Sequence, residues 1–147
     1  MKTSSCRLFF CGLALLLSGC QTGGVVLRET PLGVSETRRV IASVIGETRG
    51  VSENGRELMS KYYDKKGKNI DKMDMAKERY FTQVTVLGDR RPYDVQVEVL
   101  IEARDQDGGW ELADRDDEKA AVVADKIRKA LNQSRDSRNV IDDFRSF

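Results

Sequence analysis

The segment YDVQVEVLIEAR, residues 93–104, decides the fold. Every second position of this segment carries an apolar or aromatic side chain, and the positions between them are polar except at Leu100. The alternating set consists of Tyr93, Val95, Val97, Val99, Ile101 and Ala103. Successive side chains of a strand point to opposite faces, so this two-residue period predicts a half-buried strand of an antiparallel sheet.

Further strand signals flank this segment. Residues 80–87 are rich in aromatic and β-branched side chains, and the turn sequence GDRRP at 88–92 joins them to residue 93. The two runs therefore predict a β-hairpin. The glycine-rich turn at 107–109 leads into residues 110–112, which we expect to form a third short strand or a cap on the sheet. We also expect an edge strand at 25–27 and another strand at 58–63.

Two segments show the spacing of amphipathic helices. In residues 34–45 we expect Ser35 to be the N-cap and either Gly46 or Gly50 to end the helix. In residues 116–133 acidic residues come first and basic residues late, which complements the helix dipole, and residues 132–134 are expected to end the helix. Residues 47–56 and 64–74 are polar and predict loops.

Together these elements predict an α+β fold. We expect an antiparallel sheet of about three to four strands, with an N-terminal and a C-terminal helix packed on one face. This order of elements loosely resembles the helix-grip domains of small envelope lipoproteins, such as those that accompany outer-membrane protein or lipopolysaccharide assembly. The resemblance lies in the architecture and assigns no functional residue.

The first twenty residues have the organisation of an export signal. Two basic residues precede an apolar run at 8–17, which is too short for a transmembrane helix of about 20 residues and has the length of a signal-peptide core. Leu17-Ser18-Gly19-Cys20 resembles the lipobox of bacterial lipoproteins. The resemblance implies cleavage between Gly19 and Cys20, diacylglycerol on the Cys20 sulfur and, usually, acylation of the new amine. An uncleaved membrane helix is the disfavoured alternative.

The lipobox resemblance also implies a location and a division of the chain. Gln21 follows the cysteine, where an aspartate is an inner-membrane retention signal in enterobacterial lipoproteins, so we expect the outer membrane and its periplasmic face. The membrane is then a partner through covalent lipid at Cys20. The predicted parts are a cleaved signal peptide 1–19, the lipidated cysteine and flexible tether 20–24, one domain 25–135 and a short amphipathic tail 136–147.

Composition excludes several classes of function. The sequence has no histidine, and Cys20 is the only cysteine left once Cys6 and Cys11 leave with the signal, which excludes Ser-His-Asp and Cys-His catalysis. Loss of Lys2 and Arg7 changes 25 basic against 24 acidic residues to 23 against 24, without the basic excess typical of nucleic-acid binding. We therefore expect no catalytic residue, metal site, cofactor or nucleic-acid partner.

Three local patterns are candidates for binding. Asp105, Asp107 and Glu111 resemble part of a calcium loop, but Gly109 stands where a further ligand is needed, which favours a solvated turn. Trp110 could sit at the mouth of a groove between sheet and helix, although ordinary packing is favoured. A lysine-rich segment could contact lipid headgroups, but its interspersed acids favour a solvated loop. Its lysines are Lys61, Lys65, Lys66, Lys68 and Lys72.

Two classes of function remain. The favoured one is a non-enzymatic structural or interaction module for envelope assembly or maintenance, with an envelope protein as partner. The alternative is a binding module for a small apolar or lipid ligand in a groove between sheet and helix. We expect side chains to fill the space between sheet and helices, which would favour the first class. An apolar cavity there within the usual range of about 300–1,000 Å³ would favour the second.

Overall fold

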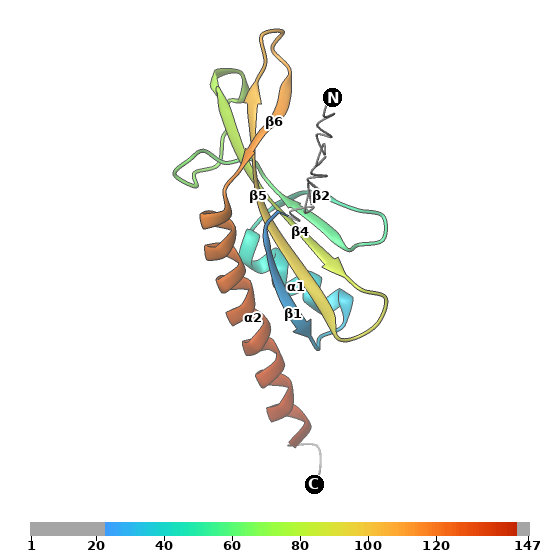
Figure 1. Cartoon of the computed structure of the whole chain (residues 1–147). Coiled ribbons are helices and arrows are strands. Elements are labelled where there is room, and N and C mark those ends of the chain that lie inside the picture. The colour runs from blue at the N-terminus through green and yellow to red at the C-terminus, as the bar shows by residue number, and fades with distance from the viewer. Residues whose placement is uncertain (1–22, 144–147) are drawn as a thin grey trace, which may run out of the picture.

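Six strands and two α-helices form the part of the chain, residues 23–143, that the computed structural model describes (Figure 1). All strand pairs are antiparallel, and the order across the sheet is β1-β5-β4-β3-β2, with β6 also paired to β5. The predicted α+β class with an antiparallel sheet is confirmed. In chain order the elements are β1 (Val25–Thr30), α1 (Val34–Ile45), β2 (Thr48–Val51), β3 (Glu57–Ser60), the 3-10 turn η1 (Met73–Met75), β4 (Glu78–Leu87), β5 (Tyr93–Arg104), β6 (Trp110–Arg115) and α2 (Asp117–Asp143).

Strand β5, the segment with the two-residue period, is the centre of the sheet. It pairs with the whole of β4, from Asp94 opposite Leu87 to Ala103 opposite Glu78, as the predicted hairpin requires. Its other edge is shared by two shorter strands, because β5 has 12 residues and β1 and β6 have 6 each. β1 pairs with the first half and β6 with the second half, so the two strands follow one another along β5 (Figure 1).

Both helices cover the same face of the sheet. α2 packs on β1 and β5, α1 packs on β3 and β4, and the helices contact each other. Val95 and Val97 of β5 are fully buried in this core, together with Ile41 of α1 and Ile127 of α2. Full burial of each such side chain contributes about 1.5–3 kcal/mol, so this layer supplies most of the stability. The helices and the sheet are therefore closely packed around these four residues.

The sheet has more strands than the predicted three to four. Residues 48–51, which we expected within a loop, form β2 and pair with β3, and the expected strand at 58–63 instead spans Glu57–Ser60. The segment Thr-Arg-Gly-Val carries little strand signal of its own. It becomes a strand because its backbone pairs with β3 at the edge of the sheet, and that pairing depends on distant residues.

The helix limits correct two further predictions. α1 ends at Gly46 as expected, but its N-cap is Gly33, whose carbonyl accepts from the Thr37 N–H, so the prediction of Ser35 as the cap is wrong. α2 does not end at residues 132–134 but continues to Asp143. Ser and Asn lower helix propensity only by tenths of a kcal/mol, and the Ser134 hydroxyl donates to the Glu36 carboxylate of α1 at 2.9 Å, which holds this turn in place.

Several predictions fall outside the described residues. The signal peptide, the lipobox and Cys20 precede residue 23, and Phe144 and Phe147 of the expected tail follow residue 143. Between residues 23 and 143 no helix is both long and apolar enough to cross a bilayer.

Candidate functional site

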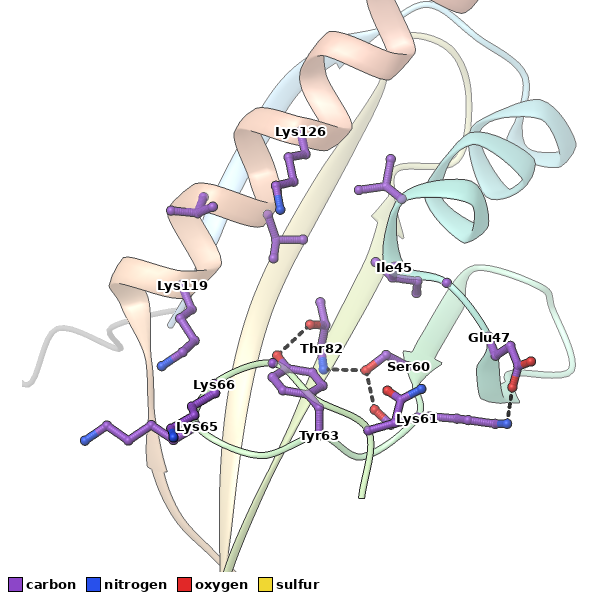
Figure 2. Close-up of a pocket in the computed structure, with 16 residues that line it drawn as sticks. Ile45, Glu47, Ser60, Lys61, Tyr63, Lys65, Lys66, Thr82, Lys119 and Lys126 are labelled. Atoms are coloured by element: carbon purple, nitrogen blue, oxygen red, sulfur yellow. Dashed lines mark hydrogen bonds and ion pairs between the residues drawn. The ribbon is translucent and has the colours of Figure 1, made fainter. Parts of the chain in front are cut away.

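A groove of about 490 Å³ opens between the helices and the sheet, beyond the C-terminal end of α1 (Figure 2). The end of α1 and the first half of α2 form its sides, and β3, β4 and the loop after β3 complete it. Its volume lies within the range of small-ligand pockets. Four aliphatic side chains contribute an apolar wall: Val44, Ile45, Val122 and Val123.

Hydroxyl groups form a connected strip on the strand side of the groove. The Tyr63 hydroxyl and Thr82 Oγ1 are 2.9 Å apart, and the Thr82 N–H donates to Ser60 Oγ at 2.9 Å. Ser60 Oγ in turn donates to the Lys61 carbonyl at 2.9 Å (Figure 2). Burial raises the pKa of the Tyr63 phenol above its ordinary value of 10.0, so this strip is uncharged at neutral pH.

The charges around the groove are mostly positive. Lys61 is paired with Glu47, the one acidic residue of the lining, and Lys119 is paired with Asp116. Within the described residues the other three lining lysines make no ion pair. They are Lys65, Lys66 and Lys126. The groove therefore combines an apolar wall with a cationic rim.

The rim lysines come from two elements that are far apart in sequence. Lys65 and Lys66 extend outward at the mouth from the loop after β3, while Lys119 and Lys126 project from α2 (Figure 2). The loop is shaped by Asp64, whose Oδ1 accepts the N–H groups of Lys66 and Lys68 at 2.9 Å each. The Asp64 carboxylate thus binds the loop backbone, which leaves the side chains of Lys65 and Lys66 at the rim.

Only part of the lysine-rich segment noted in the sequence belongs to the groove. Lys61, Lys65 and Lys66 line the groove, whereas Lys68 and Lys72 do not. Lys119 and Lys126 were not predicted as site residues, although their spacing of seven places them on one face of α2, next to Val122 and Val123. Nothing in the local sequence indicated that this helical face would meet the lysine loop.

Asp116 caps α2 at the edge of this site. Its Oδ1 accepts the Lys119 N–H at 2.9 Å, and its carbonyl accepts the Ala120 N–H at 2.9 Å, which satisfies donors of the first helical turn. Hydrogen bonds from the Lys119 side chain, and then from the Lys119 backbone, lower the pKa of Asp116 below its ordinary value of 3.8. The same side-chain hydrogen bond raises the pKa of Lys119.

Acid is expected to remove the contribution of Asp116 to stability. Because the pKa of this carboxyl is lower in the folded than in the unfolded protein, the contribution is complete above about pH 4 and is lost as pH falls further. Asp116→Asn retains a capping oxygen but not the charge, so its free energy of unfolding should change less between pH 7 and pH 3, measured by urea denaturation. Asp116→Ala should lose about 1 kcal/mol at pH 7. Equal pH dependence of the native and Asn forms would contradict this account.

Trp110 lies on the other face of the sheet, away from the helices. It is opposite Arg104 in the β5–β6 pair, and the guanidinium carbons of Arg79 and Arg104 are 4.1 and 5.6 Å from its ring centroid. It is not among the residues that line the groove. The structure therefore provides no support for the groove mouth proposed at Trp110, and the favoured alternative of packing describes its contacts.

Arg79 and the aromatic residues around it form a layered cluster, the arginine stack, on this second face. The Arg79 guanidinium lies between two rings, 3.9 Å from the centroid of Tyr62 and 4.1 Å from that of Trp110. Its Nε donates to the Glu102 carboxylate at 2.6 Å. The Arg49 guanidinium carbon also lies over the Tyr62 ring, 4.4 Å from its centroid. The two-residue period predicted only that β5 is half-buried, because alternation does not show whether the charged side chains of the outer face are free or stacked.

The acidic turn before β6 behaves as a hairpin turn. The Gly109 N–H donates to Asp105 Oδ1 at 2.5 Å, and the Asp105 N–H donates to the Gly109 carbonyl at 3.0 Å. In the chain from residue 23 to 143, no group of three or more acidic, cysteine or histidine side chains is placed to hold a metal ion. The hairpin hydrogen bonds and the exposure of residues 105–109 show a solvated turn at this segment.

Comparisons with known proteins add no relatives. No protein-family model matches the chain, and neither does any curated protein or any solved structure. The proposed function therefore rests on the residues and geometry of this chain.

Proposed function

We propose that this protein is a non-enzymatic binding module of the bacterial envelope, anchored by lipid on Cys20 to the periplasmic face of the outer membrane. Its groove holds a small ligand that has an acidic group and an apolar part. The observation that carries this proposal is the groove of about 490 Å³ with aliphatic walls and a cationic rim. The lipid anchor is supported by the lipobox resemblance at residues 17–20.

The two halves of the groove favour different parts of such a ligand. Apolar surface placed against the Val44–Ile45 and Val122–Val123 side chains would gain about 25 cal/mol for each Å² removed from water. An acidic group at the rim would accept charge-assisted hydrogen bonds from lysines, which are shorter and stronger than neutral ones. An uncharged apolar ligand would make only the first set of contacts, and inorganic phosphate only the second.

The sequence favoured an envelope protein as the partner and a small ligand as the alternative. The groove reverses that preference, because its volume, walls and charge fit a small amphipathic acid. A protein partner is tested in parallel by crosslinking in cells. Recovery of one specific envelope protein, crosslinked through the groove residues, would support binding of a protein partner over binding of a small ligand.

The ligand proposal predicts a selective loss of affinity when rim lysines are removed. Lys65→Ala combined with Lys66→Ala should weaken binding of octyl phosphate about tenfold, equivalent to about 1.4 kcal/mol, because two cations leave the mouth of the groove. The matched control is Lys68→Ala combined with Lys72→Ala, which removes the same charge from the same loop outside the groove lining. Binding is measured by calorimetry on the lipidated protein in phosphatidylcholine nanodiscs, with empty nanodiscs as the blank.

Two further probes separate the parts of the ligand. Octanol and inorganic phosphate should each bind more weakly than octyl phosphate, because each makes only one of the two kinds of contact. Equal affinity of the two double variants for octyl phosphate would show that general charge attraction, rather than the groove, retains the ligand. The proposal would then have to be abandoned.

A further inference from the structure

We propose that the sheet face opposite α1 and α2, here called the open face, lies against the bilayer that holds the lipid on Cys20. This inference rests on the proposed lipidation of Cys20 and goes beyond it, because it assigns the surface that contacts the membrane. Three observations support it: where the chain joins the domain, how short the connection is, and which side chains the open face exposes.

The first described residue, Gly23, lies on the open face. The Gln96 side chain donates to the Gly23 carbonyl at 3.0 Å, and the Arg115 side chain packs against the Gly23 backbone. Both belong to the open face, since Gln96 alternates with the buried Val95 and Val97, and Arg115 binds Glu98 of the same face at 2.8 Å. Gly23 thus lies where β1 and β6 follow one another along β5, and from here the chain leads back to Cys20.

The connection to the lipid is short compared with the domain. Only Gln21 and Thr22 lie between Cys20 and Gly23, so the Cα atoms of Cys20 and Gly23 are at most about 11 Å apart. A folded domain of this size has a radius of gyration of about 14 Å. A connection shorter than the radius of the domain holds the surface around its attachment point close to the headgroups. The face that carries the helices is then turned toward water.

The strands expose four large apolar residues, and three of them lie on the open face. The fourth, Val51 of β2, is opposite the buried Leu58 and so belongs to the helix-covered face. Val26, Leu87 and Leu112 are 38%, 37% and 55% exposed. Their partners across the sheet are Gln96, Asp94 and Glu102, which places all three on the open face.

The polar groups of this face also suit a lipid surface. Aromatic rings and arginines are favoured at the boundary between headgroups and acyl chains, since each combines an apolar body with a polar or charged end. The open face presents both, in Trp110 and in Arg104 beside it. Arg79 and Arg115 are already neutralised by Glu102 and Glu98, so attraction to anionic lipid is secondary to apolar contact.

The orientation has a consequence for the groove. The groove lies between the helices and the helix-covered face, so the sheet separates it from the bilayer that carries the anchor. A ligand would therefore enter from the aqueous side.

The position of Trp110 allows a direct test, because it is the single tryptophan of the sequence. The lipidated protein is reconstituted into vesicles of phosphatidylcholine or of brominated phosphatidylcholine, which quenches nearby tryptophan. A matched variant carries Trp110→Phe and Val122→Trp, which moves the reporter to an exposed position of α2 on the helical side. A second variant carries Trp110→Phe and Leu112→Trp, which keeps the reporter on the open face at a more exposed position.

We expect brominated lipid to quench the native protein and the Leu112→Trp form at least twofold more than the Val122→Trp form. Equal quenching at all three positions, or stronger quenching at position 122, would overturn the proposed orientation while leaving the groove proposal intact. Flotation of the vesicles is measured in parallel. Protein that fails to float with them would overturn the lipidation of Cys20, and the orientation with it.

Discussion

A Cys20→Ala form is expected to accumulate as the full-length precursor, without fatty acid and without stable membrane attachment. The thiolate of Cys20 is the nucleophile that the lipobox resemblance assigns to lipid transfer, and alanine offers no atom for a thioether. Each buried methylene of an acyl chain contributes about 0.8 kcal/mol, so a protein without the acyl chains predicted at Cys20 would lack the whole anchor. Metabolic labelling with palmitate, the mass of the purified protein and flotation of membranes measure the three effects.

The other cysteines of the sequence supply the control. Cys6→Ala and Cys11→Ala change residues of the predicted signal peptide, upstream of the cleavage site, and should label and mature normally. Palmitate on the Cys20→Ala protein would end the lipoprotein interpretation. It would also remove the basis for placing the open face on the bilayer.

Arg79→Ala is expected to lower the free energy of unfolding by about 2–3 kcal/mol, the largest loss predicted for any surface substitution here. The side chains of Arg79 and Glu102 are only 14% and 18% exposed, so alanine would leave a largely buried carboxylate without its partner. It would also remove the cation between the Tyr62 and Trp110 rings. Urea denaturation followed by circular dichroism measures the effect without depending on Trp110 fluorescence.

Two variants distinguish the arginine stack from general charge effects. Arg128→Ala removes an exposed arginine whose ion pair with Asp125 is 3.7 Å long, and should change stability by less than about 0.5 kcal/mol. Arg79→Lys retains the charge but cannot form the forked contact with a carboxylate, so it should recover less than half of the loss. If Arg79→Ala lowered the free energy of unfolding no more than Arg128→Ala, the arginine stack would not contribute to stability.

Local patterns predicted the elements whose signals are contained in a few neighbouring residues. The strict alternation of residues 93–104 identified β5, and the helical spacing of residues 34–45 identified α1, which ends at Gly46, one of the two glycines expected to end it. Helix α2 was found at its start but not at its end, because its continuation through Ser134 depends on a contact with Glu36 of α1. Strand β2 was missed because pairing with β3, rather than propensity, makes it a strand.

The candidate site shows the same division more strongly. The lysines of the loop after β3 were noticed as a group, yet three of them line the groove and two do not. Lys119 and Lys126 belong to α2, more than fifty residues further along the chain, and nothing near them in sequence marks them as part of one surface. The arginine stack likewise joins Arg49, Arg79 and Trp110 from three separate strands.

The sequence by itself determined which catalytic residue types the chain lacks, and it predicted the lipid anchor. The chain contains no histidine, cleavage at the predicted site would leave Cys20 as its one cysteine, and the lipobox resemblance depends on four adjacent residues. Tertiary structure decided where the groove lies, which lysines surround it and on which face the chain leads to Cys20. The physical reason is range: periodicity and motifs act between neighbours along the chain, whereas a binding surface forms only when packing brings distant segments together.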